Sequence, residues 1–250
     1  MLKKKKIFYN KLFPDKSIIS KSDTESGSSF ISDFFEKLKI DDESVSYISV
    51  PIDASRITKI IKNHLEKYNI DSLKLTITDC TAGVGGDSIS FSKFFKTVNS
   101  IEIDTNRFNY LLNNINAYEI NNVNCYNEEC IKYLKQSEQD IIFIDPPWGG
   151  FGYKLHDRIR LKLNNSKIEK IIRNLLFKKI YLFVLKLPKN YDFEFLFRYI
   201  KKYKDKVDIY LYNLEKMSIV VIENIDMIPV SDYLSWADIV SKEKIAHTDC

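Results

Sequence analysis

The 250-residue chain has the composition of an ordinary folded protein. Hydrophobic residues make up 44% and charged residues 29%, which excludes disordered, collagen-like and coiled-coil chains. Its 38 Lys and Arg against 34 Asp and Glu give a net charge of +4, which is compatible with a nucleic-acid partner without establishing one.

The first 70 residues divide into an extension and a small lobe. Residues 1–29 include a stretch rich in Ser, Asp and Lys and are expected to be poorly ordered. Apolar residues recur at helical spacing over 30–39 and again over about 54–68, where Asp53 is the expected N-cap. We therefore assign residues 30–70 to a small helical N-terminal lobe.

Short apolar segments and amphipathic segments then alternate along the chain. This alternation predicts the α/β class, with a mostly parallel sheet that has helices on both faces. The expected strands are 73–78, 97–103, 123–126, 141–144 and 180–185, and the expected helices between them are 87–95, 106–118, 131–135 and 167–176.

The end of the chain breaks this alternation. After a helix over 193–202, strands over 207–212 and 218–223 are separated only by a short polar turn, which predicts an antiparallel hairpin. By analogy, seven strands with this arrangement are the Rossmann-like sheet of class I methyltransferases. The methyltransferase domain is expected to span residues 71–225, followed by a tail over 226–250.

Cysteine content and hydropathy bear on the compartment. Cys80, Cys125, Cys130 and Cys250 form no CxxC pair, and with only three histidines they predict no metal site. The longest apolar run is far too short to span a bilayer. We expect an intracellular protein of the nucleus or cytoplasm that enters no membrane.

The first candidate site is a glycine-rich turn between a strand and a helix. Asp79, Thr81, Gly83 and Gly85 lie in this turn, where glycines let the backbone approach a ligand closely. A nucleotide-like cofactor is the natural occupant. The alternative is an ordinary tight turn, because the pattern completes neither the dinucleotide fingerprint nor a P-loop.

Acidic residues follow the next two strands. Glu102 and Asp104 come at the end of the second strand, where a carboxylate in such sheets reaches ribose hydroxyls. Glu128, just past the third strand, could accept a hydrogen bond from an adenine amino group. The alternatives are solvated charges at strand ends and, for Asp104, a helix cap.

The third candidate site is Asp145-Pro146-Pro147-Trp148-Gly149-Gly150, which directly follows the strand over 141–144. An exocyclic amine on a base must be held by acceptors and desolvated before it can attack a methyl donor. Prolines stiffen the loop and present carbonyl acceptors, and the aromatic ring offers a stacking platform. A structural turn is the alternative.

These motifs together resemble those of the trimethylguanosine synthases, which are RNA cap guanine-N2 methyltransferases. The resemblance covers roughly residues 30–223. It is most specific in the segment 146–150 with the Tyr that follows it, and in the Leu-Pro-Lys-Asn sequence after the next strand. The matching segments are 47–50, 79–86, 101–104, the pair Asn113-Asn114, 146–150 with Tyr153 after it, and Leu187-Pro188-Lys189-Asn190. Position 145 departs from the family pattern, because it is Asp here and often Ser in relatives.

The resemblance implies S-adenosyl-L-methionine as the cofactor. The turn from Gly83 to Gly85 and Asp79 would meet its methionine part, Glu102 its ribose and Glu128 its adenine. The full expected cofactor-binding set is Asp79, Thr81, Gly83, Gly85, Glu102, Asp104, Glu128 and Asp145.

The resemblance also implies the contacts to the RNA cap. Trp148 would stack on 7-methylguanine, whose positive charge attracts an electron-rich indole. Asn114 and the carbonyls of Asp145 and Pro146 would hold the guanine edge. Lys189 and Asn190 would face the cap phosphates or the base, and Tyr153 completes the expected substrate-binding set.

The sequence therefore predicts direct in-line methyl transfer to the N2 amine of a 7-methylguanosine cap by a monomer whose partner is capped RNA. Asp145, Pro146 and Trp148 are the expected catalytic residues. Two alternatives stay open. An Asp-Pro-Pro-Trp string is also typical of adenine-N6 methyltransferases, and the chain could be a cap-binding subunit that has lost catalysis.

Overall fold

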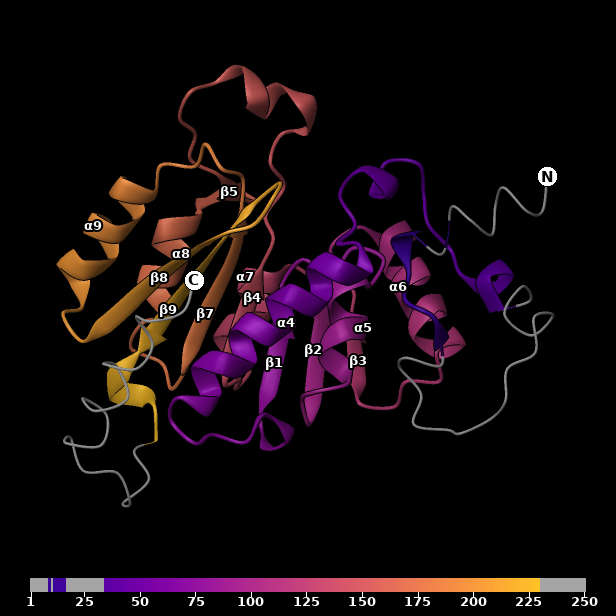
Figure 1. Cartoon of the computed structure of the whole chain (residues 1–250), viewed down its shortest axis with the longest axis horizontal. Helices are drawn as coiled ribbons and strands as arrows, with labels where there is room; N and C mark the ends of the chain where they lie inside the picture. Colours follow the sequence, from indigo (N-terminus) through magenta and orange to yellow (C-terminus); the bar gives the residue numbers. More distant parts are fainter. Residues whose placement is uncertain (1–8, 10, 17–33, 230–250) are drawn as a thin grey trace.

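A computed structural model describes residues 9, 11–16 and 34–229 (Figure 1). Its centre is a seven-stranded sheet with strand order β3-β2-β1-β4-β7-β9-β8. The parallel strands are β1 (Thr76–Asp79), β2 (Thr97–Ile101), β3 (Val123–Tyr126), β4 (Ile141–Ile144) and β7 (Leu182–Leu187). Strand β9 (Ser218–Asn224) pairs antiparallel with both β7 and β8 (Val207–Asn213). This confirms the predicted mostly parallel sheet with a C-terminal antiparallel hairpin.

Helices cover both faces of the sheet (Figure 1). One face carries α4 (Pro51–Glu66), α5 (Gly86–Ser92) and α6 (Thr105–Ala117), and the other carries α7 (Cys130–Gln136), α8 (Ile168–Leu175) and α9 (Phe193–Tyr203). All four residues of β4 are buried; Ile141 and Phe143 pack toward α4, and Ile142 and Ile144 toward α8. Strands β4 and β7 are therefore buried on both faces, as expected, whereas β3 at the sheet edge is only partly buried, contrary to the expectation.

The N-terminal region packs on α6. Residues 34–37 are helical, and Phe34 and Phe35 are buried against Tyr118 and its neighbours. Phe13, which is 1% exposed, joins the same cluster. The expectation that residues 1–29 are poorly ordered is therefore wrong for 11–16, because buried aromatic contacts fix this segment. The rest of that extension and the tail beyond 229 lie outside the described residues.

Several predicted boundaries shift by a few residues, and two of them shift for clear local reasons. Helix α4 begins at Pro51 with Val50 at its N-cap, so the expected cap Asp53 lies inside the first turn instead. Strand β1 begins at Thr76 because Asp71 accepts a hydrogen bond from the Leu73 N–H and sets a 3-10 turn, η2 (Ser72–Lys74).

The segment between β4 and α8 contains structure that the sequence pattern does not reveal. It holds the 3-10 helix η3 (Gly150–Leu155) and a two-stranded ribbon of β5 (Lys162–Leu163) and β6 (Ser166–Lys167). Its first part projects from the body of the protein at the top of Figure 1. None of the helices that the structure describes has the length and apolar character that a bilayer span requires.

Candidate functional site

The candidate site lies where the carboxyl ends of β1, β2 and β4 meet. The Cys80 N–H donates to the Phe143 carbonyl at 2.9 Å, and the Ala82 N–H donates to the Ile101 carbonyl at 3.0 Å. The loop after β1 is thus bonded to both neighbouring strands. The chain crosses from one half of the sheet to the other between β1 and β4, which is where open α/β sheets bind ligands.

The glycines after β1 have backbone conformations that favour glycine. Gly83 has a φ of 55° and Gly85 a φ of 104°. A Cβ added at Gly85 would lie 3.1 Å from Leu111 Cδ1, so this position allows α6 to pack closely. A Cβ at Gly83 would meet nothing within 4 Å, so the space beside Gly83 is open to a ligand.

Asp79 ends β1 and is only 1% exposed. One carboxyl oxygen accepts the Ser88 hydroxyl at 2.6 Å and the other the Thr81 N–H at 3.3 Å. Burial, reinforced by the nearby Asp87 carboxyl, raises the pKa of Asp79 to about 8. A buried acid with this shift is a favourable position for a positively charged ligand.

Glu102 links β2 to the glycine turn. Its side chain is buried, and its two oxygens accept the Gly83 N–H at 2.9 Å and the Asp104 N–H at 2.8 Å. Burial raises the pKa of Glu102 in spite of these two hydrogen bonds. The structure thus brings Glu102 directly against the predicted cofactor turn.

The other two acidic residues occupy less specialised positions. Asp104 accepts the Arg107 N–H at 2.9 Å and caps α6, so the cap that was the alternative for this residue is present. Glu128 is half-buried next to Asn127, whose side chain donates to the Glu102 carbonyl at 2.9 Å. The loop after β3 is thereby held beside the loop after β2.

The Asp145-Pro146-Pro147-Trp148 segment leaves β4 at the same edge. The Asp145 N–H donates to the Thr81 hydroxyl at 2.8 Å, which ties this segment to the loop after β1. Trp148 is half-buried, and its ring is nearly perpendicular to that of Tyr153, with centroids 5.3 Å apart. The left-handed residues Gly149 and Gly150 then turn the chain into η3.

A buried set of polar side chains lies beneath this segment, and the sequence analysis missed the part that Lys186 plays in it. The ammonium of Lys186, on β7, contacts the Asp145 carboxylate at 2.6 Å and the Ser49 hydroxyl at 2.8 Å. Ser49 in turn donates to Asp87 at 2.5 Å. We call the residues Ser49, Asp79, Asp87, Asp145 and Lys186 the acid network, because it contains three carboxyl groups and one ammonium.

The acid network has unbalanced charge. Burial raises the pKa of Asp87 to about 6 although Lys186 opposes this shift, and one oxygen of Asp87 is buried without a hydrogen-bond partner among the described residues. Burial also raises the pKa of Asp145. Burial alone would lower the pKa of Lys186, but Asp145 and Asp87 together raise it.

Asn114 does not have the position that its predicted role requires. It is fully buried, and its amide nitrogen donates to the carbonyls of Lys39 at 2.8 Å and Val84 at 2.9 Å. Its oxygen accepts the Lys39 N–H at 2.8 Å. This corrects the prediction that Asn114 holds the guanine edge, because its amide instead joins the N-terminal region to the glycine turn.

Lys189 and Asn190 follow β7 at the same carboxyl edge of the sheet as Trp148, which follows the parallel strand β4. The Asn190 amide donates to the carbonyls of Tyr153 at 2.8 Å and His156 at 2.7 Å, so it supports the loop that carries Tyr153. Lys189 is exposed and accessible to a negatively charged partner. The two neighbours thus differ in their environment.

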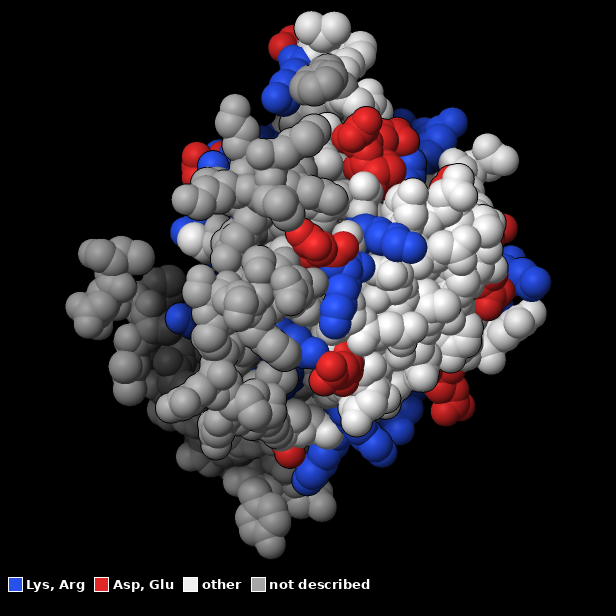
Figure 2. Space-filling model, turned by 90° about the vertical axis from the view of Figure 1, so that its right-hand side faces the viewer, with Lys and Arg blue, Asp and Glu red and all other residues white. Residues whose placement is uncertain are grey.

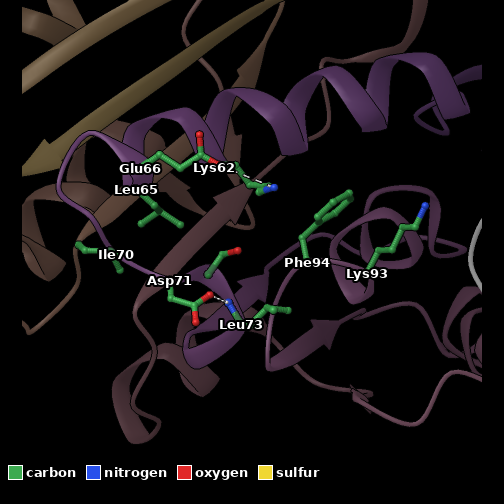
Figure 3. A pocket seen from close by; sticks show the side chains of 9 residues that line it. Lys62, Leu65, Glu66, Ile70, Asp71, Leu73, Lys93 and Phe94 are labelled. Carbon is green, nitrogen blue, oxygen red and sulfur yellow. Dashed lines mark hydrogen bonds and ion pairs between the residues drawn. The ribbon is translucent and has the colours of Figure 1, made fainter. Parts of the chain in front are cut away.

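Two hollows of the described surface lie away from this edge. The larger, of about 300 Å³, lies between the C-terminal part of α4 and the residues that precede β1, and Lys62, Ile70 and Phe94 contribute to its lining (Figure 3). It is therefore at the amino ends of the strands. Within the described ranges, no group of three or more His, Cys, Asp or Glu side chains is arranged to hold a metal ion.

Charge on the α6 side of the molecule is mixed. Figure 2 shows this side, where Lys and Arg alternate with Asp and Glu across the described surface. This view shows no broad basic area among the described residues.

The chain has the fold of the class I methyltransferases, with a seven-stranded, mostly parallel sheet that ends in an antiparallel hairpin. Among solved structures, the chain is similar to the 16S rRNA N2 methyltransferase RsmC of T. thermophilus in complex with AdoMet and guanosine, with a TM-score of 0.52 and 13% identity over 74% of this chain and 43% of that one. A putative methyltransferase, yhhF from Escherichia coli, gives a TM-score of 0.46 and 16% identity over 67% of this chain and 84% of that one.

Sequence comparison identifies the family. Residues 73–225 match the model of the RNA cap guanine-N2 methyltransferases, so the chain belongs to this family. It is also 41% identical over 207 residues to an uncharacterized protein of Acanthamoeba polyphaga mimivirus, which covers 75% of this chain and 79% of that protein. The resemblance noted from the motifs is therefore confirmed at the level of the family.

Proposed function

We propose that the protein transfers a methyl group from S-adenosyl-L-methionine to the exocyclic N2 amine of 7-methylguanosine at the cap of RNA. The observation that carries this proposal is the position of the Asp145-Pro146-Pro147-Trp148 segment. Its first residue, Asp145, donates its N–H to the Thr81 hydroxyl in the loop after β1, which supports a role for this segment beside a cofactor bound at the glycine turn. Membership of the cap guanine-N2 methyltransferase family supports the same assignment.

The residues at the end of β1 fit a sulfonium cofactor. The cofactor is positively charged at sulfur and at its amino group, and the buried carboxyl groups of Asp79 and Asp87 lack enough positive charge nearby. The open space at Gly83 admits a ligand close to the backbone. Glu102, held at the same turn, is placed to receive the ribose hydroxyls, and the half-buried Glu128 an adenine amine.

The rings of Trp148 and Tyr153 fit a planar base. Because the two rings are nearly perpendicular, they form a corner in which a base can stack on one ring and meet the other at its edge. N7-methylation makes guanine cationic, which strengthens stacking on an indole. Lys189, exposed at the end of β7, is available to the cap phosphates.

The chain's own residues then promote the transfer by positioning and proton transfer. When bound, S-adenosyl-L-methionine supplies an electrophilic methyl group, and its sulfur keeps the electron pair of the broken S–C bond. The lone pair of the N2 amine forms the new N–C bond, after which the nitrogen loses one proton. Asp145 orients the amine by accepting an N–H and takes that proton before water removes it.

One observation favours a second candidate function. The side chain that follows β4 is a carboxylate, Asp145, which can accept an N–H from the amino group of adenine as well as from that of guanine. Adenine-N6 methylation of RNA or DNA is therefore the alternative activity. Transfer to adenosine oligonucleotides without transfer to 7-methylguanosine would favour it. A cap-binding subunit without catalysis would bind the cap and fail to bind S-adenosyl-L-methionine.

Replacing Trp148 tests the stacking contact. We expect Trp148→Ala to lower kcat/KM for 7-methylguanosine diphosphate by about 10- to 100-fold, the usual effect of losing one base-stacking ring. Trp148→Phe should retain more activity because it keeps a flat ring. The measurement is steady-state transfer of labelled methyl groups. Undiminished transfer by Trp148→Ala would contradict the proposal.

A further inference from the structure

Lys186 is a charged residue in a strand where every other side chain is apolar. Strand β7 reads Leu-Phe-Val-Leu-Lys-Leu, all six residues are buried, and the Lys186 side chain is only 4% exposed. Burying an ammonium is unfavourable unless it is paired and hydrogen-bonded. The position of this lysine, one strand away from Asp145, therefore calls for an explanation beyond packing.

The partners of Lys186 come from three separate elements. Asp145 follows β4, Ser49 precedes α4, and Asp87 lies in the first turn of α5, where it accepts the Ser49 hydroxyl. The negative charges around Lys186 belong to Asp145, Asp87 and Asp53. Asp145 in turn faces Asp79 and Asp87, which are acids as well. Lys186 is the single ammonium of the acid network.

Asp145 is fixed at two atoms. Its N–H donates to Thr81, and its Oδ2 lies 2.6 Å from the Lys186 ammonium. No side chain among the described residues donates a hydrogen bond to Oδ1. The Trp148 indole N–H, which is buried without a hydrogen-bond partner there, is near enough to lower the pKa of this carboxyl. The Asp145 side chain is 18% exposed, against 4% for Lys186, so the ammonium holds the carboxylate from the buried side.

We propose that Lys186 is a positioning residue, which holds the Asp145 carboxylate by Oδ2 so that Oδ1 is presented beside Trp148 as the acceptor for the N2 amine. This inference rests on the proposed function and extends it. Lys186 does not contact the substrate; it acts through Asp145. It makes Asp145 selective for a base that carries an amino group at this position.

The pairing has a consequence for pH dependence. Burial raises the pKa of Asp145 and Lys186 opposes that shift, so without Lys186 the carboxyl would hold its proton to higher pH. A protonated Asp145 cannot take the proton of the amine. Loss of Lys186 should therefore move the acidic limb of the kcat/KM profile to higher pH. Asp87 also faces Lys186, so its pKa rises in the variant as well. Asp79 and Asp53 keep their positions near the site.

The test compares the wild type with Lys186→Met and with Lys204→Met as a matched control. Lys204 is also buried, with a 7% exposed side chain, and it pairs with Asp226 at 3.6 Å and donates to the Leu176 carbonyl, away from the site. We expect Lys186→Met to lower kcat for 7-methylguanosine diphosphate about 10-fold at pH 7, with partial recovery at higher pH. Lys204→Met should keep the wild-type profile.

Binding gives a second readout that does not need turnover. The wild type should bind 7-methylguanosine diphosphate about 10-fold more tightly than 7-methylinosine diphosphate, which lacks the N2 amine, because a hydrogen bond to a charged acceptor is lost. Lys186→Met should lose most of this preference at pH 7. Calorimetry measures both affinities, and an unchanged preference would overturn the proposal.

A double substitution keeps the test valid if Lys186→Met does not fold. Asp145→Asn with Lys186→Met removes both charges together, which buried pairs usually tolerate. We expect its kcat to equal that of Asp145→Asn alone, since Lys186 acts only through the carboxylate. An additional 10-fold loss in the double variant would show a merely structural role and overturn the inference.

The two proposals fail in different ways. If the wild type methylates 7-methylguanosine diphosphate but Lys186→Met has the same pH profile and the same base preference, only the positioning role is wrong. If the wild type neither binds nor methylates this cap analogue, the proposed function is wrong and the positioning role is overturned with it.

Discussion

Two buried clusters of ionisable side chains in this protein differ in how well their charges are matched. The first is the acid network at the carboxyl edge of the sheet. The second, which we call the His64–Glu223 cluster, lies where α4 packs on β8 and β9 and consists of His64, Lys67, Tyr68, Tyr212 and Glu223. Both are buried in the folded chain, but only the first is short of partners.

In the His64–Glu223 cluster both carboxylate oxygens of Glu223 have hydrogen-bond partners. Glu223 is fully buried, and it accepts from His64 at 2.5 Å, Tyr68 at 2.6 Å and Lys67 at 3.3 Å. Burial alone would raise the pKa of Glu223, but these partners lower it below its ordinary value. A buried acid that is fully satisfied within the chain supports the fold.

In the acid network the shifts have the opposite sign. The pKa of Asp79 rises to about 8 and that of Asp87 to about 6, because burial outweighs the hydrogen bonds and the single ammonium. The comparison teaches that buried acids with too little positive charge nearby mark a ligand site, whereas matched ones mark the structural core.

The largest effect on stability is expected from a substitution that removes the acid of the His64–Glu223 cluster. Glu223→Ala should lower the free energy of unfolding by about 3 kcal/mol, because it removes one partner of a buried charged set. Methyl transfer per folded molecule should not change. Urea unfolding and activity at low temperature measure the two quantities, and a large loss of activity in the folded fraction would contradict this assignment.

Asp79→Asn should have the opposite effects, with a loss of activity and no loss of stability. We expect kcat/KM to fall by about 100-fold, since the variant removes a charged acceptor for the cofactor. The free energy of unfolding should stay equal or increase, because the amide has no charge to bury. Thermal unfolding with steady-state kinetics checks both; a clear loss of stability with full activity would place Asp79 with the structural acids.

The smallest expected effect concerns pH. A carboxyl whose pKa is higher in the folded state binds more protons there, so its contribution to stability is complete below the unfolded value and is lost as pH rises to the folded value. For Asp79 and Asp87 this window extends up to about 8 and about 6. The melting temperature of the ligand-free protein should therefore fall from about pH 5 to about pH 8.

S-adenosyl-L-methionine should act against this loss. Because a cation favours the ionised carboxyl groups, the increase in melting temperature that it produces should grow over the same pH range. Scanning calorimetry at several pH values with and without the cofactor gives the comparison. A ligand-induced increase that is constant across this range, or that shrinks as pH rises, would contradict the assignment of these acids to the cofactor.

Much of the fold followed from local sequence patterns. The strand over 141–144 has the predicted bounds because it is a short buried run between polar residues. The strand over 123–126 also has the predicted bounds, although its place at the sheet edge leaves it only partly buried. The segment 11–16 was missed because Phe13 is buried by contacts with residues that are distant in sequence. The β5–β6 ribbon was missed because strands of two residues carry no periodic pattern.

The site was predictable only where its residues form local motifs. The glycine turn, Glu102 and the segment from Asp145 to Trp148 could be placed at one sheet edge from the strand pattern alone. Lys186 interrupts an apolar run and carries no motif, so its contact with Asp145 depends on the pairing of β4 with β7. Asn114 matched a family motif, but its packing between Lys39 and Val84 depends on tertiary structure.

The most direct test of the proposed function is to identify the atom that receives the methyl group. The purified protein is incubated with S-adenosyl-L-methionine labelled with ¹³C at its methyl group, in the presence of 7-methylguanosine diphosphate and an adenosine oligonucleotide. The product is then assigned by NMR. We expect the label on the N2 amine of 7-methylguanosine; label on adenine N6, or in neither acceptor, would contradict the account.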